Sequence, residues 1–95
     1  MLFVVHALDR PGALPVRRAN YEAHKAFLQT CGEQGVRMVM SGPLVADDGD
    51  TMIGSFLLLE AADRATIERF NRADPFHKAG IWTDVKITAF IRRVG

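Results

Sequence analysis

The sequence predicts one α+β domain over residues 1–95, with the element order βαββαβ and a single four-stranded antiparallel sheet. Four segments rich in aliphatic and β-branched residues indicate strands. Two segments in which apolar residues recur every three or four positions indicate helices. Turn sequences rich in Gly, Pro and Asp separate these segments. Two helices that cover one face of such a sheet form a ferredoxin-like sandwich.

The first strand is expected at residues 2–8 and the first helix at residues 14–34. Both faces of the strand are apolar, which indicates cover on both sides, and the turn sequence "DRPG" follows it. Pro15 fits the first turn of the helix, and Gly32 and Gly35 mark its end. The expected buried face of the helix consists of Val16, Ala19, Ala23, Phe27, Thr30 and Cys31.

A hairpin is expected next, with strands at residues 36–40 and 51–60. The polar sequence "ADDGD" between them is typical of a turn. The sequence "SGPL" at residues 41–44 is expected to break or bend the first of these strands. The second is apolar on both faces, like the strand at the start of the chain.

A second helix and a short helical turn are expected before the last strand. Asp63 is a suitable N-cap for the second helix, and this helix ends before Asp74, because a residue that precedes a proline resists helical angles. Asp74 then caps a short turn that begins at Pro75 and closes at Gly80. Residues 82–91 alternate between apolar and polar side chains and form the last strand.

The composition is that of an ordinary globular protein, with 48% hydrophobic and 24% charged residues. Twelve basic and eleven acidic residues leave a net charge of +1 without a basic stripe, so nothing favours binding to nucleic acid. Cys31 is the single cysteine, which excludes an internal disulfide and fits a reducing compartment. No apolar run approaches the roughly 20 residues of a membrane span, and the start lacks the basic region of a signal peptide. A cytoplasmic protein is expected.

One face of the predicted sheet has no cover. Two helices cover only one face of a four-stranded sheet, yet two of the strands are apolar on both faces. Large exposed apolar patches are uncommon on monomers, and a second copy of the chain is the simplest cover. The sequence therefore predicts a homodimer with its sheets packed face to face.

His24 is the first candidate for chemistry. It lies beside the expected buried face of the first helix, on one flank with Arg17, Tyr21 and Leu28. These residues form a polar cluster at the edge of the seam between helix and sheet, where a small cleft can form. The alternative is a half-exposed histidine without a task, and the residues alone favour this alternative.

Asp74 is the second candidate. A carboxylate that caps a helix has a fixed position and a second oxygen to spare. If His24 lies within reach, the carboxylate fixes the imidazole tautomer and stabilises the imidazolium, which makes an oriented base. The simpler alternative is ordinary capping of the turn that begins at Pro75.

The remaining polar residues give weaker signals. His6 faces away from Val5 and is expected to be a hydrogen-bonded wall residue, whereas His77 can equally point to water. Three histidines without close spacing and without a cysteine cluster do not predict a metal site. "SGP" at residues 41–43 offers backbone N–H groups to an anion or is simply a strand bend. No nucleotide-binding or nucleophile-elbow motif is present, and no cofactor is expected.

Four segments taken together are fairly specific for a known family. "LDRPGAL" follows the first strand, "YEAHKAFL" lies in the first helix, "SGPLVADDGDTMIGS" crosses the hairpin, and "ADPFHKAGIW" precedes the last strand. In this order, and over nearly the whole chain, they resemble the YCII-related (YciI-like) family.

The resemblance implies a dimeric α/β-barrel built from ferredoxin-like subunits, similar to muconolactone isomerase, with a His–Asp pair in a pocket. The His of "EAHKAFL" is His24, and the Asp of "ADPF" is Asp74. Many members carry Arg-Pro just before this His, where the present chain has "YEA", so an anion-binding arginine is either missing or replaced by Arg18 or Tyr21. The substrate-binding residues expected are His6, Arg18, Tyr21, Ser41, Gly42, Pro43 and Phe76.

The expected function is that of a small cofactor-free enzyme with His24 as its general acid and base. It would catalyse an isomerisation or an elimination on a small oxygenated, possibly cyclic, metabolite. The alternative is a non-catalytic module that binds a small ligand or another protein on the same fold. Binding of single-stranded RNA shares the element order, but it needs a basic surround that this sheet lacks.

Overall fold

The computed structural model describes all residues from 1 to 95 and confirms the order βαββαβ of a ferredoxin-like fold. A 3₁₀ turn, η1, follows the first helix. The elements are β1 (Leu2–Asp9), α1 (Leu14–Gln29), η1 (Cys31–Gln34), β2 (Arg37–Val45), β3 (Met52–Glu60), α2 (Arg64–Ala73), α3 (Pro75–Lys78) and β4 (Trp82–Phe90).

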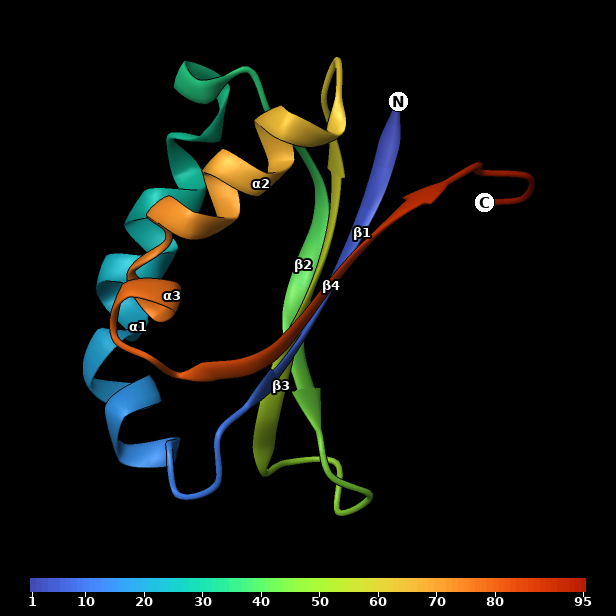
Figure 1. Cartoon of the computed structure of the whole chain (residues 1–95). Coiled ribbons are helices and arrows are strands. Elements are labelled where there is room, and N and C mark those ends of the chain that lie inside the picture. Colours follow the sequence, from blue (N-terminus) through green and yellow to red (C-terminus); the bar gives the residue numbers. More distant parts are fainter.

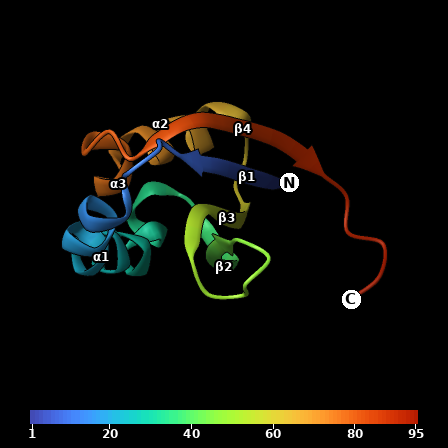
Figure 2. The same cartoon turned by 90° about the horizontal axis from the view of Figure 1, so that it is seen from below.

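The four strands form one antiparallel sheet in the order β2-β3-β1-β4, so β2 and β4 are the edges. All three helices lie on one side of this sheet, and the other side carries no helix (Figure 1). The sheet is strongly twisted, and the segment after β4 extends on the side away from the helices (Figure 2). No helix of the chain is long and apolar enough to cross a membrane.

The core lies between the helices and the sheet in two clusters. The larger cluster packs α2 and η1 against β1 and β3, around Phe3, Leu59 and Phe70. The smaller cluster surrounds Phe76 and Trp82, near the start of β4. Because strand residues alternate between the two faces, the odd-numbered positions of β1 and β3 supply most of the sheet's share of this core.

Strand β2 continues through "SGPL", so of the two expected alternatives, a break or a bend, the break is wrong. The pairing of β2 with β3 shifts between Met38 and Met40, before this sequence, and again between Leu44 and Val45, at its end. Pro43 is tolerated because β2 is an edge strand, where a missing N–H costs no ladder hydrogen bond if it faces outward.

The first helix is shorter than predicted. Helix α1 ends at Gln29, and residues 31–34 form η1. The backbone of Thr30 leaves the helical region with φ −102° and ψ 15°. Gly35 then closes the turn in the left-handed conformation, with φ 75°.

The expected buried face of α1 was also wrong in part. The two buried residues of this helix are Arg17 and His24, whereas Ala19 and Ala23 are exposed. The helix is therefore rotated so that two polar side chains, not the alanines, point inward. Each of the two has buried polar partners, which compensates for the loss of water.

The predicted capping at Asp63 is confirmed. Its carboxylate accepts hydrogen bonds from the backbone N–H of Thr66 at 2.9 Å and from the Thr66 hydroxyl at 2.7 Å. The Thr66 hydroxyl, followed by the backbone N–H, holds the pKa of Asp63 below its ordinary value. The charged form of Asp63 thus favours the start of α2.

We expect Gly54→Ala to lower the free energy of unfolding by roughly 1–3 kcal/mol, the usual range for overpacking. Gly54 is buried in β3, and a Cβ there would collide with the backbone oxygen of Ala7 and lie 3.0 Å from the side chain of Leu44. Gly42→Ala in β2 is the matched control, because a Cβ at Gly42 meets nothing within 4 Å. Urea unfolding of both variants checks this, and equal midpoints would contradict it.

Candidate active site

A cavity of about 510 Å³ lies between α1 and the half of the sheet formed by β2 and β3. This volume is within the range of small-molecule sites. Helix α1 and the segment after it supply one wall, the two strands supply the opposite wall, and α3 supplies one aromatic ring. The lining residues are Arg17, Tyr21, His24, Lys25, Leu28, Gln29, Cys31, Met38, Ser41, Gly42, Pro43, Met52, Ser55, Phe56, Leu57 and Phe76.

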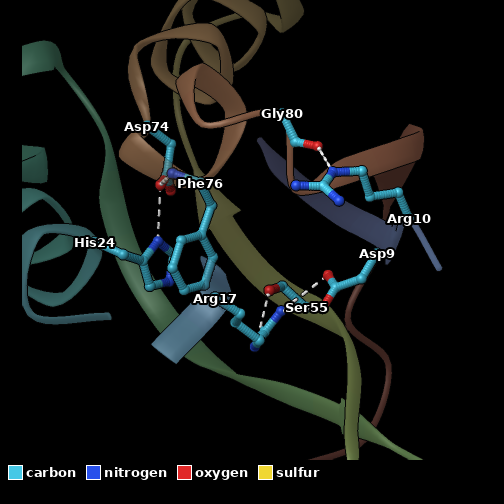
Figure 3. Close-up of polar contacts among 8 residues, drawn as sticks. All are labelled: Asp9, Arg10, Arg17, His24, Ser55, Asp74, Phe76 and Gly80. Carbon is cyan, nitrogen blue, oxygen red and sulfur yellow. Dashed lines mark hydrogen bonds and ion pairs between the residues drawn. The ribbon is translucent and has the colours of Figure 1, made fainter. Parts of the chain in front are cut away.

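His24 lines this cavity, and Asp74 lies behind it, outside the cavity lining. Nδ1 of His24 lies 2.8 Å from Oδ1 of Asp74, across 50 residues of sequence. The same Oδ1 accepts the backbone N–H of Phe76 at 2.9 Å, which caps α3. Asp74 is 1% exposed and His24 is 8% exposed. One carboxylate oxygen therefore caps a helix and binds an imidazole at the same time (Figure 3).

The geometry determines which nitrogen of His24 is free. An ionised carboxylate only accepts hydrogen bonds, so the proton of the neutral imidazole lies on Nδ1. The other nitrogen, Nε2, then carries a lone pair. No group of the chain hydrogen-bonds Nε2. Nε2 is also not fully buried, unlike Nε of Arg17 and Nε1 of Trp82, which have no partner. Nε2 is the atom of the pair that is left to exchange a proton with a bound molecule.

Aromatic packing holds the imidazole of His24 in place. The ring of Phe76 is stacked on it, with a centroid distance of 3.9 Å and an angle of 2° between the planes. The indole of Trp82 meets the imidazole edge-on at 6.3 Å. The hydrogen bond from Asp74 and these rings together restrict the imidazole to one orientation.

Arg17 forms a second polar cluster on the same inner face of α1. It lies seven residues before His24, which corresponds to about two helical turns. Its Nη1 donates to both carboxylate oxygens of Asp9, at 2.9 and 3.0 Å, and its Nη2 donates to Oγ of Ser55 at 2.9 Å. This cluster ties α1 to β1 and β3 (Figure 3).

The charge of Arg17 is compensated by the buried carboxylate of Asp9. The side chains of Arg17 and Asp9 are only 5% and 6% exposed, and Cζ of Arg17 lies 4.8 Å from the centroid of the Phe76 ring. This cation–π contact adds to the ion pair. The Nε atom of Arg17 is buried without a partner, which is an unfavourable feature of the cluster. Removing one member of such a pair typically costs about 3–5 kcal/mol.

The sequence did not indicate Asp9 or Ser55 as site residues. Asp9 stood within an apparent turn sequence, and Ser55 stood in an apolar strand. The only available signal was Arg17, which shares a helix flank with His24. Sequence spacing gave no indication of the partners of Arg17, because Ser55 is 38 residues away from it in the chain.

Five of the seven residues expected to bind substrate line the cavity: Tyr21, Ser41, Gly42, Pro43 and Phe76. His6 and Arg18 do not line it. Both are exposed. The alternation of β1 turns His6 away from the helices, and one residue of helical rotation turns Arg18 away from the direction of Arg17.

Nowhere do three or more His, Cys, Asp or Glu side chains come close enough to share an ion. His77 lies in α3 and is exposed, close in sequence to Asp74 but outside the cavity lining. Cys31 is buried in the core and also forms part of the cavity wall.

Comparison with known proteins shows relatives along almost the whole chain. The model of the YCII-related domain matches residues 1–91. The protein YciI of Escherichia coli O6:H1 is 33% identical over 100 residues, which cover 95% of this chain and 96% of that protein. YciI of Shigella flexneri matches with the same identity and coverage.

A solved structure with the same fold is that of 5-chloro-2-hydroxyhydroquinone dehydrochlorinase (TftG) from Burkholderia phenoliruptrix AC1100, in complex with 2,5-dihydroxybenzoquinone. It is 36% identical, with a TM-score of 0.85, and the match covers 98% of this chain and 96% of TftG. This likeness confirms the fold class, a ferredoxin-like subunit of the dimeric α/β-barrel type. With a family model that matches residues 1–91 and relatives that match nearly end to end, this chain belongs to the YCII-related family.

Proposed function

We propose that this protein is a small-molecule lyase that eliminates a leaving group such as chloride from a hydroxylated ring compound. The observation that carries the proposal is the contact of 2.8 Å between Oδ1 of Asp74 and Nδ1 of His24, a residue that lines the cavity. The relationship to TftG, a dehydrochlorinase that binds a dihydroxybenzoquinone, supports the class of substrate. His24 is the general acid and base, and Asp74 positions it.

The first proton transfers follow from the free lone pair on Nε2. Nε2 takes the proton of a ring hydroxyl, and the electron pair of the broken O–H bond stays on the oxygen, from which it delocalises into the ring. Asp74 stabilises the imidazolium that forms. The imidazolium then returns its proton to the ring carbon that bears the chlorine, which gives a neutral ring ketone.

Elimination completes the reaction. Nε2 removes the proton of a second ring hydroxyl, the electron pair moves through the ring, and chloride leaves with the pair of its C–Cl bond. The sum is loss of HCl and formation of a quinone, so no external oxidant or reductant is consumed. These reaction steps need one oriented base that removes a proton twice, and a cavity that holds the ring close to this base.

The proposed enzyme is a homodimer in which a second copy covers the open face of the sheet. Met40 and Phe90 on this face are 55% and 41% exposed, and Ile91 and Val94 in the segment after β4 are 70% and 93% exposed. The segment after β4 extends on the same side (Figure 1). A surface with this many apolar residues favours association over hydration.

We expect His24→Gln to lower turnover of 5-chloro-2-hydroxyhydroquinone by roughly 10²- to 10⁴-fold, the usual contribution of general acid–base catalysis. Release of chloride and the absorbance of the quinone product measure this. His77→Gln is the matched control, because His77 is exposed outside the cavity and should leave turnover unchanged. Binding of 2,5-dihydroxybenzoquinone by a wild type that shows no turnover would instead identify a binding module.

We expect Asp74→Asn and Asp74→Ala to separate capping from orientation of His24. Asn caps a helix about as well as Asp, so Asp74→Asn should stay close to the wild type in urea unfolding. Its turnover should still fall toward that of His24→Gln, because the neutral amide does not stabilise an imidazolium. Asp74→Ala should lose turnover and also roughly 2–4 kcal/mol of stability, because the cap is lost and the buried Nδ1 of His24 is left without a partner. If Asp74→Asn keeps wild-type turnover, the role of Asp74 is limited to capping α3.

We expect the protein to sediment as a dimer at micromolar concentration, because obligate interfaces usually bury more than about 2,000 Å². The double substitution Met40→Glu/Phe90→Glu places charges on the open face and should produce monomers. Ala65→Glu on the exposed surface of α2 is the control and should remain dimeric. A wild type that sediments as a stable folded monomer at this concentration would refute the homodimer.

A further inference from the structure

The cavity beside His24 is much longer than a single six-membered ring. Its wall follows α1 from Arg17 to Leu28. These two residues are eleven positions apart, so their attachment points are separated by roughly 16 Å along the helix axis. The opposite oxygens of a quinone ring are only about 5 Å apart. A single ring that contacts His24 therefore leaves at least one end of the cavity unfilled.

The register of the strands shows which residues lie at each end. Helix α1 and strand β3 run in the same direction (Figure 1), and the contact between Arg17 and Ser55 fixes one end. Leu57 lies two residues further along β3, and Met38 of β2 is opposite Leu59, two residues further again. The apolar end of the cavity consists of the four apolar lining residues toward the C-terminus of α1: Leu28, Cys31, Met38 and Leu57.

The apolar end is an extension of the main core of the protein. Cys31 and Leu57 belong to the larger core cluster, and Leu28 and Met38 pack against it. Leu28 and Met38 are only half-buried, so they carry the apolar surface that remains open to the cavity. None of the four side chains is a strong hydrogen-bond donor or acceptor. The polar parts of a ligand therefore gain no partner from them.

Lys25 and Gln29 of α1 line the same stretch of the cavity without making this end polar. Both residues are exposed. A long charged side chain keeps its polar tip in water and lays its apolar stem along the surface. The two residues are thus suited to the rim of the apolar end and not to its floor.

Apolar surface that faces a water-filled cavity favours an apolar ligand group. Transfer of such a group to the apolar end releases water from both surfaces. Each buried methylene strengthens binding by about fourfold. A polar group of the same size gains little, because it loses its hydrogen bonds to water and finds no partner at the apolar end.

We propose that the apolar end binds an apolar substituent of the substrate, so that the substrate class is hydroxylated rings with a short alkyl side chain. The inference rests on the proposed function for the ring itself and deepens it. Leu28 lies four residues after His24, about 6 Å along the same helix, so a substituent next to a ring hydroxyl can reach it. The substituent takes no part in the bond changes. Its burial adds affinity and holds the ring in one orientation relative to His24.

Two derivatives of 2,5-dihydroxybenzoquinone test the apolar end by calorimetry. One carries a propyl group on a free ring carbon, and the other carries a 2-hydroxyethyl group of nearly the same size there. We expect the wild type to bind the propyl compound about 10- to 60-fold more tightly than the unsubstituted quinone, because the propyl group is buried in part or in full. The hydroxyethyl compound should gain no more than about fourfold, because its polar tip loses water without finding a partner.

Met38→Gln and Met52→Gln are a matched pair of variants at the two ends of the cavity. Both methionines line the cavity and are half-buried, but Met52 lies at the start of β3, before Ser55. Glutamine has nearly the length of methionine and adds a polar amide. We expect Met38→Gln to lower the preference for the propyl compound over the unsubstituted quinone by at least about fourfold, and Met52→Gln to keep this preference. Circular dichroism and urea unfolding confirm that both variants are folded.

The outcomes distinguish the apolar end from the proposed reaction. Equal affinities of the wild type for the propyl compound and the unsubstituted quinone overturn the apolar end, even if the protein eliminates chloride from 5-chloro-2-hydroxyhydroquinone. An equal gain from the propyl and hydroxyethyl groups overturns it too, because room alone then explains the binding. So does an unchanged preference in Met38→Gln, or an equal loss in Met52→Gln, and so does a wild type that binds none of the quinones. A wild type that prefers the propyl compound without any turnover leaves the apolar end in place and overturns the lyase.

Discussion

Two polar side chains on the inner face of α1 are the constraint on which the rest of this structure depends. Arg17 and His24 are both buried, and burial without partners would cost several kcal/mol for each. Asp9 and Ser55 accept hydrogen bonds from the terminal nitrogens of Arg17, and Asp74 pairs with His24. These contacts connect the helix with β1, β3 and the start of α3. The position of α1 is thus determined by polar pairing as much as by apolar packing.

The same constraint explains why the cavity lies where it does. The larger core cluster fills the space between α2, η1 and the sheet with closely packed apolar side chains. Beside it, under α1, the long side chain of Arg17 and the stacked rings of His24 and Phe76 leave a hollow between helix and sheet. Polar groups at a site of this kind commonly reduce stability in exchange for function. The unpartnered Nε of Arg17 is the clearest instance here.

Patterns within short stretches of the sequence predicted much of the fold. They also indicated His24 and Asp74 as candidates, but not the cluster around Arg17. The element order, the cap at Asp63 and the short helix after Asp74 follow from hydrophobic period and from capping chemistry, which act over a few residues. The inward face of α1 was not predictable in this way, because periodicity counts apolar residues and ignores partners. Arg17 faces the interior in place of the alanines because Asp9 and Ser55 accept its hydrogen bonds there.

The approach of His24 to Asp74 belongs to the tertiary structure. Fifty residues separate the two side chains, and only the resemblance to a family indicated that they meet. The course of β2 through "SGPL" likewise depended on its place at the edge of the sheet, which no local signal gives.

The spacing of seven residues between Arg17 and His24 sets the distance and the relative direction of the two side chains on α1. At about 1.5 Å per residue, it separates the two attachment points by roughly 10.5 Å and keeps both on one face. Inserting one residue between them would lengthen this distance only slightly but would rotate one group by about 100° and turn it out of the cavity. The stretch between these two side chains is therefore fixed in length.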